Sequence, residues 1–165
     1  MSVATPEYRN AISRFLSGVT VVTAQHAGAR HGITASAVCS VTLEPPTLLV
    51  CLNRQSITCQ TVIDAMHFCV NVLAAHQLPV ARLFAGKAAD KFAEFAALTG
   101  KAPTDGPAGS PHLPDALATL ECRVAAHQDV GTHRVFFGEV LQVAVAEGEP
   151  LAYFRGQFTT LHSAG

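Results

Sequence analysis

The chain has 165 residues, and its 11 Lys and Arg stand against 12 Asp and Glu, which gives a formal net charge of −1 at pH 7. No basic surplus is available to follow a phosphate backbone, which argues against nucleic-acid binding as the main role. Charged residues make up 14% and hydrophobic residues 49% of the chain, whereas an average soluble domain is roughly 25% charged. One small domain has difficulty burying so much apolar surface alone, and we expect a homodimer with an apolar interface.

The N-terminus and the cysteines indicate a cytoplasmic protein. The first ten residues, MSVATPEYRN, lack the cationic and apolar regions of a secretory signal. No apolar run approaches the ~20 residues of a membrane-spanning helix. The cysteines are five, lie in apolar segments and form no C-x-x-C pair. We interpret them as buried small side chains in a reducing compartment rather than as disulfides or zinc ligands. We expect neither membrane binding nor a metal site.

The beginning of the chain predicts a helix. Thr5-Pro6-Glu7 is typical of a helix start, with Thr5 as the N-cap, proline at the first helical position and an acidic side chain near the positive end. The apolar residues that follow share one helical face as far as Gly18. They are Tyr8, Ile12, Phe15 and Leu16.

Three strands are expected next, at Val19–Ala24, Ile33–Leu43 and Thr47–Asn53. A turn carrying Gly28 and Gly32 separates the first two. The second strand ends at Pro45 and Pro46, since proline cannot donate a ladder hydrogen bond. The third strand is apolar almost throughout, which predicts burial on both faces.

The middle of the chain alternates helices with one strand. Ser56 is predicted to cap a helix that runs to Met66, and His67–Leu73 follows as a strand. Two more helices are expected, one ending near Gly86 and one around Phe92 and Phe95. The interval Gly100–Pro114 is rich in Gly, Pro and Ser and predicts a surface excursion.

The C-terminal part predicts strands at Ala118–Ala126, His133–Val145 and Leu151–Phe158. In the middle one, alternate residues form an apolar face that only Glu139 interrupts: Val135, Phe137, Leu141, Val143 and Val145. Strands dominate, and no βαβ alternation is sustained. We therefore predict a mainly β fold, a closed or nearly closed antiparallel barrel with peripheral helices. No repeat or second domain is visible, so we expect one domain over residues 1–165.

Common catalytic motifs are absent from the sequence. It has no G-x-G-x-x-G after a strand, no P-loop, no G-x-S-x-G and no H-E-x-x-H. Its eight histidines are scattered, without a pair at helical ligand spacing beside a carboxylate. These absences remove the usual support for Rossmann enzymes, hydrolases and metalloenzymes.

Polar residues remain where predicted strands meet loops. The stretch His31–Pro46 combines an apolar strand with small hydroxyls, and Ser56 opens a helix two residues after Arg54. A helix start with free N–H groups favours an anion. A flat polar heterocycle on a phosphorylated chain would fit such a layout, with its edge on backbone and hydroxyl groups and its face on apolar side chains. Strand-end hydroxyls, however, more often satisfy their own loop, and this alternative stays open.

Several segments, in this order, resemble the flavin reductase-like family. They are VTVVTA, GITASAVCSVTLEPPTLLVCLN followed by Ser56, FCVNVLAAHQ, LFAGK, GTH and PLAYFRGQF. The resemblance covers about Tyr8 to Phe158, and the run Gly32–Asn53 is its most specific part. It implies the FMN-binding split β-barrel of Greek-key type. The most similar members are reductase components of two-component aromatic monooxygenases, of the 4-hydroxyphenylacetate and phenol hydroxylase type.

The resemblance also implies a set of site residues. Those expected to hold the flavin are Thr34, Ala35, Ser36, Ser40, Val41, Thr42, Cys51, Leu52, Asn53, Ser56, Phe84, Ala85, Gly86 and Lys87. The first three would line the isoalloxazine edge, largely through backbone groups, Ser56 would help hold the phosphate, and Phe84–Lys87 would close over the flavin tail. His133 would lie beside the nicotinamide as the catalytic residue. Tyr153 and Arg155 would lie near the pyridine nucleotide or the exposed flavin face.

The implied activity is NAD(P)H-dependent reduction of FMN or FAD, with NADH favoured over NADPH. The reduced flavin would diffuse to a separate flavin-dependent oxygenase. Two alternatives stay open: a non-catalytic flavin carrier or sensor of the same fold, and an apolar-ligand or assembly module without redox function. An ordinary loop role for His133, and a solvated or dimer-contact role for Arg155, also stay open.

Overall fold

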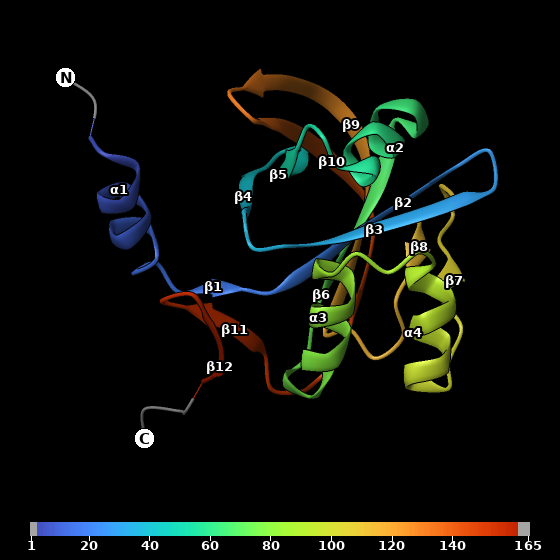
Figure 1. The fold of residues 1–165 in the computed structure, drawn as a ribbon. Coiled ribbons are helices and arrows are strands. Elements are labelled where there is room, and N and C mark those ends of the chain that lie inside the picture. The colour runs from blue at the N-terminus through green and yellow to red at the C-terminus, as the bar shows by residue number, and fades with distance from the viewer. Residues whose placement is uncertain (1–2, 162–165) are drawn as a thin grey trace.

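The computed structural model describes residues 3–161. Antiparallel strands are its main secondary structure, and the α-helices lie on the outside (Figure 1). The helices are α1 (Thr5–Ile12), α2 (Ile57–Ala65), α3 (Leu78–Ala85) and α4 (Lys91–Thr99), with a short 3-10 helix η1 (Ala75–Gln77) before α3. The strands are β1 (Ser17–Gly18), β2 (Thr20–His26), β3 (Ala29–Ala35), β4 (Val38–Leu43), β5 (Pro46–Asn53), β6 (His67–Val72), β7 (Thr104–Asp105), β8 (Pro111–His112), β9 (Ala118–Val130), β10 (His133–Val145), β11 (Leu151–Phe154) and β12 (Gln157–Thr160).

Seven strands form one antiparallel sheet in the order β3-β2-β6-β9-β10-β5-β4. Its two edge strands, β3 and β4, are consecutive in the chain and are joined by Ser36 and Ala37. The Cys51 N–H donates to the Ala37 carbonyl at 3.0 Å, and β3 also contacts β5. The sheet therefore curves until its two edges approach each other at this link. The prediction of a mainly β fold with antiparallel strands and peripheral helices is confirmed.

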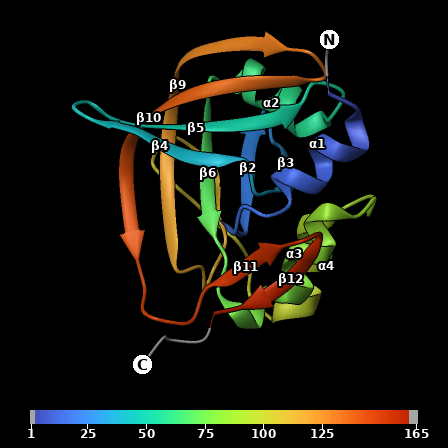
Figure 2. The same cartoon turned by 90° about the vertical axis from the view of Figure 1, so that its left-hand side faces the viewer.

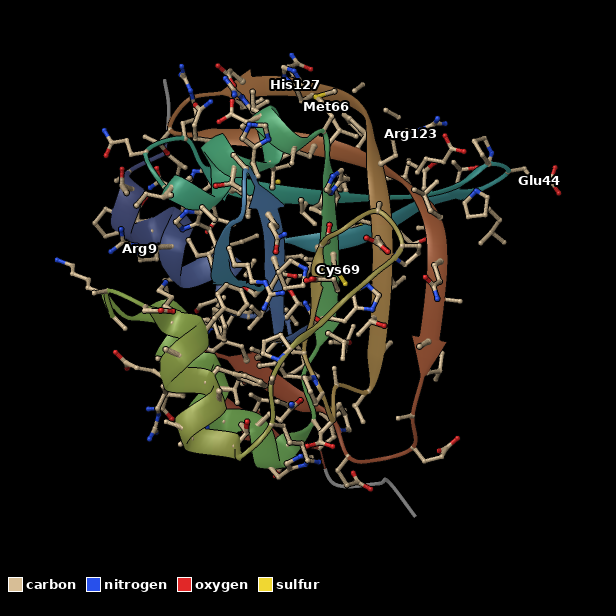
Figure 3. All side chains as sticks on the ribbon, turned by 90° about the vertical axis from the view of Figure 1, so that its right-hand side faces the viewer. Arg9, Glu44, Met66, Cys69, Arg123 and His127 are labelled. Atoms are coloured by element: carbon tan, nitrogen blue, oxygen red, sulfur yellow. The ribbon has the colours of Figure 1, made fainter. Side chains whose placement is uncertain are left out.

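Two smaller sheets accompany the large one. The order β1-β11-β12 forms a separate layer next to α3 and α4 (Figure 2), and β7 pairs with β8 alone. The β4–β5 hairpin projects from the body, with Glu44 at its tip (Figure 3). No described helix combines the length and the apolar character that a bilayer crossing requires.

The core consists of two clusters that share β2. Val22 belongs to the cluster inside the barrel, with Leu52, Phe68 and Phe136. Its neighbour Val21 belongs to the second cluster, which lies under α3 and α4. Successive side chains of a strand point to opposite faces, so β2 is buried on both sides, and its first five residues are all buried.

Three predicted strands differ in the structure. Ile33–Leu43 is two strands, because the chain turns at Ser36 to cross from one sheet edge to the other. Leu151–Phe158 is a hairpin, since Arg155 adopts a positive φ of 52° at the turn between β11 and β12. β5 is buried on one face only: alternate residues from Leu48 to Leu52 are buried and those between them are half-buried. Gly32 lies within β3 instead of in a turn.

The excursion between α4 and β9 is only partly at the surface, which corrects the prediction. Ser110 and Leu113 are buried. The Asn71 side chain accepts a hydrogen bond from the Leu113 N–H at 2.7 Å, and the Thr23 hydroxyl donates to the Pro111 carbonyl. Buried polar groups in strands therefore fix this segment against the large sheet.

A large apolar surface stays uncovered in the single chain. α1 has Ala4 rather than Thr5 as its N-cap, ends at Ile12 and buries none of its residues; in Figure 1 it stands away from the barrel. Phe15 is 72% exposed and Val145 is 79% exposed. On β10 the buried residues are Phe136 and Gly138, so the predicted apolar stripe lies on the outer face and is half-buried to exposed.

Candidate functional site

Three segments that are far apart in sequence meet where β5 ends. His133, the first residue of β10, is the cross-strand partner of Asn53. On the other side of β5, the Ala37 carbonyl accepts the Cys51 N–H. Ser36, Asn53 and His133 are all exposed. The structure thus places three predicted site residues at one end of the sheet: Ser36, Asn53 and the predicted catalytic His133.

Hydrogen bonds hold the turn that carries His133. The Arg54 N–H donates to the Thr132 carbonyl at 3.0 Å, and the Thr132 hydroxyl lies 2.9 Å from His133 Nδ1. Because Nδ1 has this partner, Nε2 is the ring nitrogen left to meet a ligand. The turn is therefore anchored to the end of β5, and the histidine side chain remains exposed.

Charged side chains surround this turn. Asp129 lies 2.5 Å from Arg134 Nε and 3.1 Å from Arg54 Nη2. The hydrogen bond from Arg134 lowers the pKa of the Asp129 carboxyl, and the nearby guanidinium charges lower it further. Two arginines against one carboxylate leave the surroundings of His133 with a positive balance, which favours an anionic ligand.

Ser56 caps α2 as predicted. Its Oγ accepts the Cys59 N–H at 3.1 Å and donates to the Asn53 carbonyl at 2.8 Å. The Asn53 side chain accepts the Gln55 N–H at 2.9 Å. Side-chain caps of this kind define a helix start, whose N–H groups carry partial positive charge. The predicted anion position therefore lies directly beyond the end of β5.

Several predicted hydroxyls are already engaged inside the chain. Thr34 donates to the Ala81 carbonyl of α3 at 2.7 Å, and Thr42 accepts the Glu44 N–H at 3.2 Å. The Ala35 carbonyl accepts a hydrogen bond from Thr20. The Thr42 contact is the local satisfaction that strand-end hydroxyls commonly show, whereas the Thr34 and Ala35 contacts join segments that are far apart in the chain. The exposed groups that remain for a ligand lie around Ser36, at the crossing between the sheet edges.

Ser40, Val41 and Thr42 lie apart from this place within one chain. Thr42 pairs with Thr47, six residues along β5 from Asn53. Six residues of extended strand span about 20 Å. Val41 is exposed on the projecting hairpin. The structure does not bring these three residues to His133, and their contact with a flavin stays a prediction.

The predicted site residues Cys51, Leu52 and Asn53 alternate between the two faces of β5. Leu52 is buried in the barrel core, so it can offer a ligand only its backbone. Cys51 and Asn53 point to the other face, where Cys51 is half-buried and Asn53 exposed. Burial raises the pKa of the Cys51 thiol, which therefore stays protonated and acts as a small apolar surface.

The Phe84 side chain belongs to the core, so this residue could offer a ligand only its backbone. It is 0% exposed and packs edge-on against Phe92, with ring centroids 5.3 Å apart. A Cβ on Gly32 would lie 2.6 Å from the Phe84 ring, so β3 approaches the ring as closely as glycine allows. The Phe84 ring cannot close over a ligand. Ala85, Gly86 and Lys87 are exposed at the end of α3 and remain available.

Tyr153 and Arg155 lie in the small sheet and not at the end of β5. Tyr153 pairs with Ser17 of β1, and its ring packs edge-on against Phe158. The Arg155 N–H donates to the Ser13 carbonyl at 2.9 Å. Arg155 also lines a hollow of about 420 Å³ together with α1 residues such as Arg9. Their predicted roles stay predictions.

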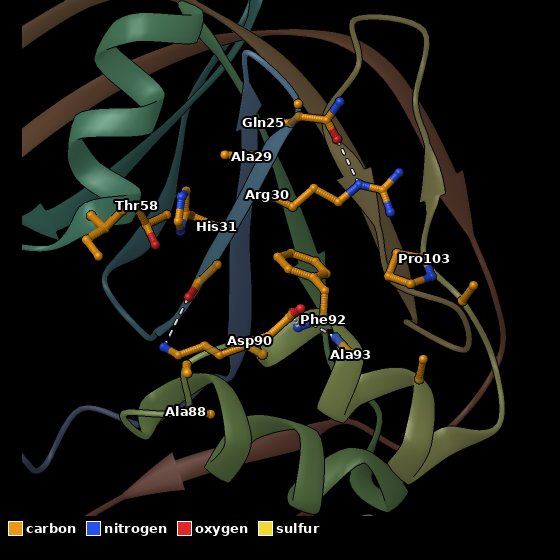
Figure 4. A pocket seen from close by; sticks show the side chains of 17 residues that line it. Gln25, Ala29, Arg30, His31, Thr58, Ala88, Asp90, Phe92, Ala93 and Pro103 are labelled. Atoms are coloured by element: carbon orange, nitrogen blue, oxygen red, sulfur yellow. Dashed lines mark hydrogen bonds between the residues drawn. The ribbon is translucent and has the colours of Figure 1, made fainter.

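A pocket of about 780 Å³ lies between the β2–β3 hairpin, the first turn of α2 and the start of α4 (Figure 4). Its charged and hydrogen-bonding side chains include Arg30, His31, Thr58 and Lys91. None of these was a predicted site residue. In the sequence, the signal for this pocket was the pair Asp90-Lys91 at a helix start. Aspartate is a common helix cap, whereas a lysine directly after it has no part in capping.

The sequence profile of the "Flavin reductase like domain" family matches residues 12–162. The chain belongs to this family. This confirms the resemblance inferred from the segments between Tyr8 and Phe158. Within the described residues, no three His, Cys, Asp or Glu side chains come together as metal ligands.

Curated relatives carry matching names. The reductase component of a 4-nitrophenol 4-monooxygenase/4-nitrocatechol 2-monooxygenase from Rhodococcus opacus is 43% identical over 152 residues, covering 92% of this chain and 78% of the relative. An FMN reductase (NADH), RutF, from Acinetobacter baylyi is 38% identical, covering 98% of this chain and 85% of the relative.

Solved structures share the fold. BorF, the flavin reductase component of a bacterial two-component tryptophan halogenase, has a TM-score of 0.86 at 32% identity, over 97% of this chain and 99% of the other. The NADH:FAD oxidoreductase SgcE6 of Streptomyces globisporus has a TM-score of 0.87 at 28% identity, over 100% and 99% of the two chains. The predicted split-barrel fold is consistent with both.

Proposed function

We propose that this chain reduces a flavin with NADH and supplies the reduced flavin to a separate flavin-dependent oxygenase. The observation that carries the proposal is the family match over residues 12–162, whose relatives include reductase components of two-component systems. The structure adds a local argument. Ser36, Asn53, Ser56 and His133 meet at one end of the sheet, with a helix start beside them.

The residues at this end fit a flavin in their chemistry. Backbone groups around Ser36 and the half-buried side chain of Cys51 would contact the isoalloxazine ring. The capped start of α2 would hold the phosphate, since helix N–H groups favour anions. Ala85, Gly86 and Lys87 would flank the tail. Thr34 would act indirectly, because its bond to Ala81 sets the distance between β3 and α3.

When bound, the flavin supplies the redox chemistry by accepting a hydride from NADH, so the chain needs neither a general acid nor a general base. What the chain contributes is position. His133, held by Thr132 and facing outward, would orient the nicotinamide against the ring. Correct orientation of two reacting rings removes much of the entropic barrier. Backbone N–H groups aimed at the ring edge would stabilise developing negative charge.

The experiment that tests the proposal is anaerobic reduction of excess free FMN by NADH, followed at 450 nm with catalytic amounts of protein. We expect many equivalents of FMN to be bleached per chain. Bleaching that stops after one equivalent would contradict the proposal and favour the flavin carrier or sensor. No change in absorbance with either FMN or FAD would favour the module without redox function.

The uncovered apolar surface supports a homodimer. α1, which buries no residue, and the outer end of β10 would pack against a second copy. Sedimentation of the purified protein should give twice the mass of one chain, and Phe15→Asp should give the single-chain mass. Leu98→Asp, at an exposed apolar residue of α4 outside this surface, is the matched control. A wild-type chain that sediments as a monomer would contradict this.

The proposal also includes the cellular compartment and the domain organisation of the chain. The five cysteines are all free thiols, which supports a reducing compartment such as the cytoplasm. The family profile extends over 151 of 165 residues, from 12 to 162. This supports one domain over the whole chain.

A further inference from the structure

The turn that carries His133 consists of two residues, Gly131 and Thr132. Val130 before the turn pairs with His133 after it. Gly131 has a positive φ of 56°, and a glycine at the first central position is typical of two-residue hairpin turns. All four residues are exposed. Burial therefore does not fix the position of His133, and polar contacts with neighbouring segments must do so.

Arg54 joins this turn to the end of β5. Its backbone N–H donates to the Thr132 carbonyl at 3.0 Å, and its Nη1 donates to the Gly131 carbonyl at 3.3 Å. Both carbonyls of the two-residue turn thus accept hydrogen bonds from one residue. Arg54 also lies two residues before Ser56, the cap of α2. It therefore connects the histidine turn with the helix start to which the proposed function assigns the flavin phosphate.

Asp129 holds the Arg54 side chain in this position. Its carboxylate lies 3.1 Å from Arg54 Nη2 and accepts two hydrogen bonds from Arg134, from Nε at 2.5 Å and from Nη2 at 3.0 Å. A bidentate pair of guanidinium and carboxylate has a defined geometry, so Asp129 is itself fixed and can orient Arg54. Among residues 3–161, no other carboxylate lies within ion-pair distance of Arg54.

The Asp129–Arg134 pair lies on the face of the sheet opposite to His133. Side chains alternate along a strand, so Arg134 shares a face with its β5 partner Leu52, which is buried in the barrel core. Burial raises the pKa of the Cys59 thiol in α2, and the charges of Arg134 and Asp129 act on this thiol as well, which places the pair near α2. Asp129 can therefore affect a ligand at His133 only through the turn.

A second ion pair between the same two strands shows what is particular about Asp129. Arg123 and Glu139 are cross-strand partners and lie 2.7 Å apart. The Glu139 side chain is 31% exposed and that of Asp129 is 35% exposed. Ion pairs at this exposure contribute little to stability. The two carboxylates differ in their connections, because only the contacts of Asp129 lead to the turn that carries His133.

We propose that Asp129 is a positioning residue for flavin reduction, which holds Arg54 against the turn and so sets the distance between His133 and the start of α2. The inference rests on the proposed function, because it takes His133 as the residue that orients the nicotinamide. One connected network would then keep the nicotinamide and the flavin phosphate at a fixed separation. A misplacement of about 1 Å in such a site can slow a reaction about 100-fold.

The test is anaerobic reduction of FMN by NADH in a stopped-flow instrument, with NADH varied to separate the limiting rate from the affinity for NADH. Asp129→Asn keeps the shape of the side chain but has one acceptor oxygen, so it cannot serve both guanidinium groups. Glu139→Gln makes the same chemical change in the other cross-strand pair and is the matched control. Asp129→Glu restores the carboxylate. Asp129→Asn is also combined with His133→Ala, and thermal unfolding midpoints verify that each variant is folded.

We expect Asp129→Asn to lower the limiting rate three- to tenfold, with the unfolding midpoint unchanged and the Kd for FMN within twofold of the wild type. Asp129→Glu and Glu139→Gln should reduce FMN within twofold of the wild-type rate. In the His133→Ala protein, Asp129→Asn should have no further effect, because it acts through the histidine.

Two results would overturn the inference while leaving flavin reduction intact. One is an unchanged limiting rate in Asp129→Asn. The other is equal slowing by Asp129→Asn with and without His133, which would show that the carboxylate acts independently of the histidine. A wild-type protein that does not oxidise NADH in the presence of FMN or FAD would instead contradict the proposed function.

Discussion

Polar groups are exposed at the end of the sheet that carries His133 and Asn53, whereas beneath the β7–β8 segment they are buried. At the first, His133 and Asn53 are exposed and anchored only by local turns. Beneath the second, Glu121 is 0% exposed, and its Oε1 accepts the Ala108 N–H at 3.0 Å and the Ser110 N–H at 3.1 Å. Polar residues that begin or interrupt strands are thus exposed in one region, where the proposed function assigns them to a ligand, and buried with partners in the other, where they hold the fold.

The buried region around Glu121 is tightly packed. Glu121 Oε2 lies 3.5 Å from His112 Nε2, and a Cβ on Gly106 would lie within 2.3 Å of both atoms. His67 Nδ1 lies 3.0 Å from the Ser110 hydroxyl. Burial and the charge of Glu121 raise the pKa of the neighbouring Cys122 thiol to about 12. The carboxylate fixes the loop through its backbone N–H groups, and Gly106 packs directly against it.

The largest expected effect is the loss of this carboxylate. Glu121→Ala leaves the buried Ser110 N–H and the half-buried Ala108 N–H without an acceptor, and each such loss costs about 1–3 kcal/mol. We expect the free energy of unfolding to fall by about 3 kcal/mol in urea denaturation. Glu121→Gln keeps an acceptor oxygen and should cost less than half as much. A loss under ~1 kcal/mol in Glu121→Ala would show that the N–H groups find other partners.

Replacement of the exposed histidine should give the reverse result. His133→Ala removes a side chain that lies outside the core, so the free energy of unfolding should change by less than ~0.5 kcal/mol. The rate of anaerobic flavin reduction by NADH should fall about tenfold, which corresponds to about 1.4 kcal/mol. Flavin affinity should stay within twofold. His76→Ala, at another exposed histidine, is the control, and unchanged reduction kinetics in His133→Ala would refute the assigned role.

The sequence predicted the elements whose signals are local. The cap at Ser56, the strand at β6 and the helices around Gly86 and Phe95 follow from residues within one turn or strand of each other. The break at Ser36 was not predictable in this way, because no Gly or Pro marks it. It is imposed by closure of the sheet, which depends on contacts between β3 and β5.

The site residues show the same difference between local signals and long-range contacts. The family resemblance assigned Asn53 to the flavin and His133 to the nicotinamide. Strand pairing places the two residues opposite each other, and their contacts with the cofactors stay predictions. The burial of the Phe84 ring was not predicted, because a phenylalanine near a helix end looks the same in sequence whether it faces the core or a ligand. Lys91 and Glu121 were missed because their partners, the Gly32 carbonyl and the Ser110 N–H, lie elsewhere in the chain.

A smaller loss of stability than that of Glu121→Ala is expected at Ser56, which caps a helix and is also assigned to the ligand. It caps α2 through the Cys59 N–H, and its assigned partner is the flavin phosphate. Ser56→Ala should lower the free energy of unfolding by about 1 kcal/mol, the usual value of a lost cap. Ser56→Asp keeps a capping oxygen, since Asp and Ser are comparable at this position, but adds a negative charge where the phosphate would lie. Its stability should therefore match the wild type.

The two substitutions separate the two roles when the ligand is varied as well. With Ser56→Asp, the Kd for FMN should rise at least tenfold because like charges repel at short range in a site of low dielectric. The Kd for riboflavin, which has no phosphate, should not change. Fluorescence titration with both flavins measures this. If the Ser56→Asp protein binds FMN as the wild type does, the phosphate does not lie at the start of α2. Ser56 would then serve the fold alone, as Glu121 does.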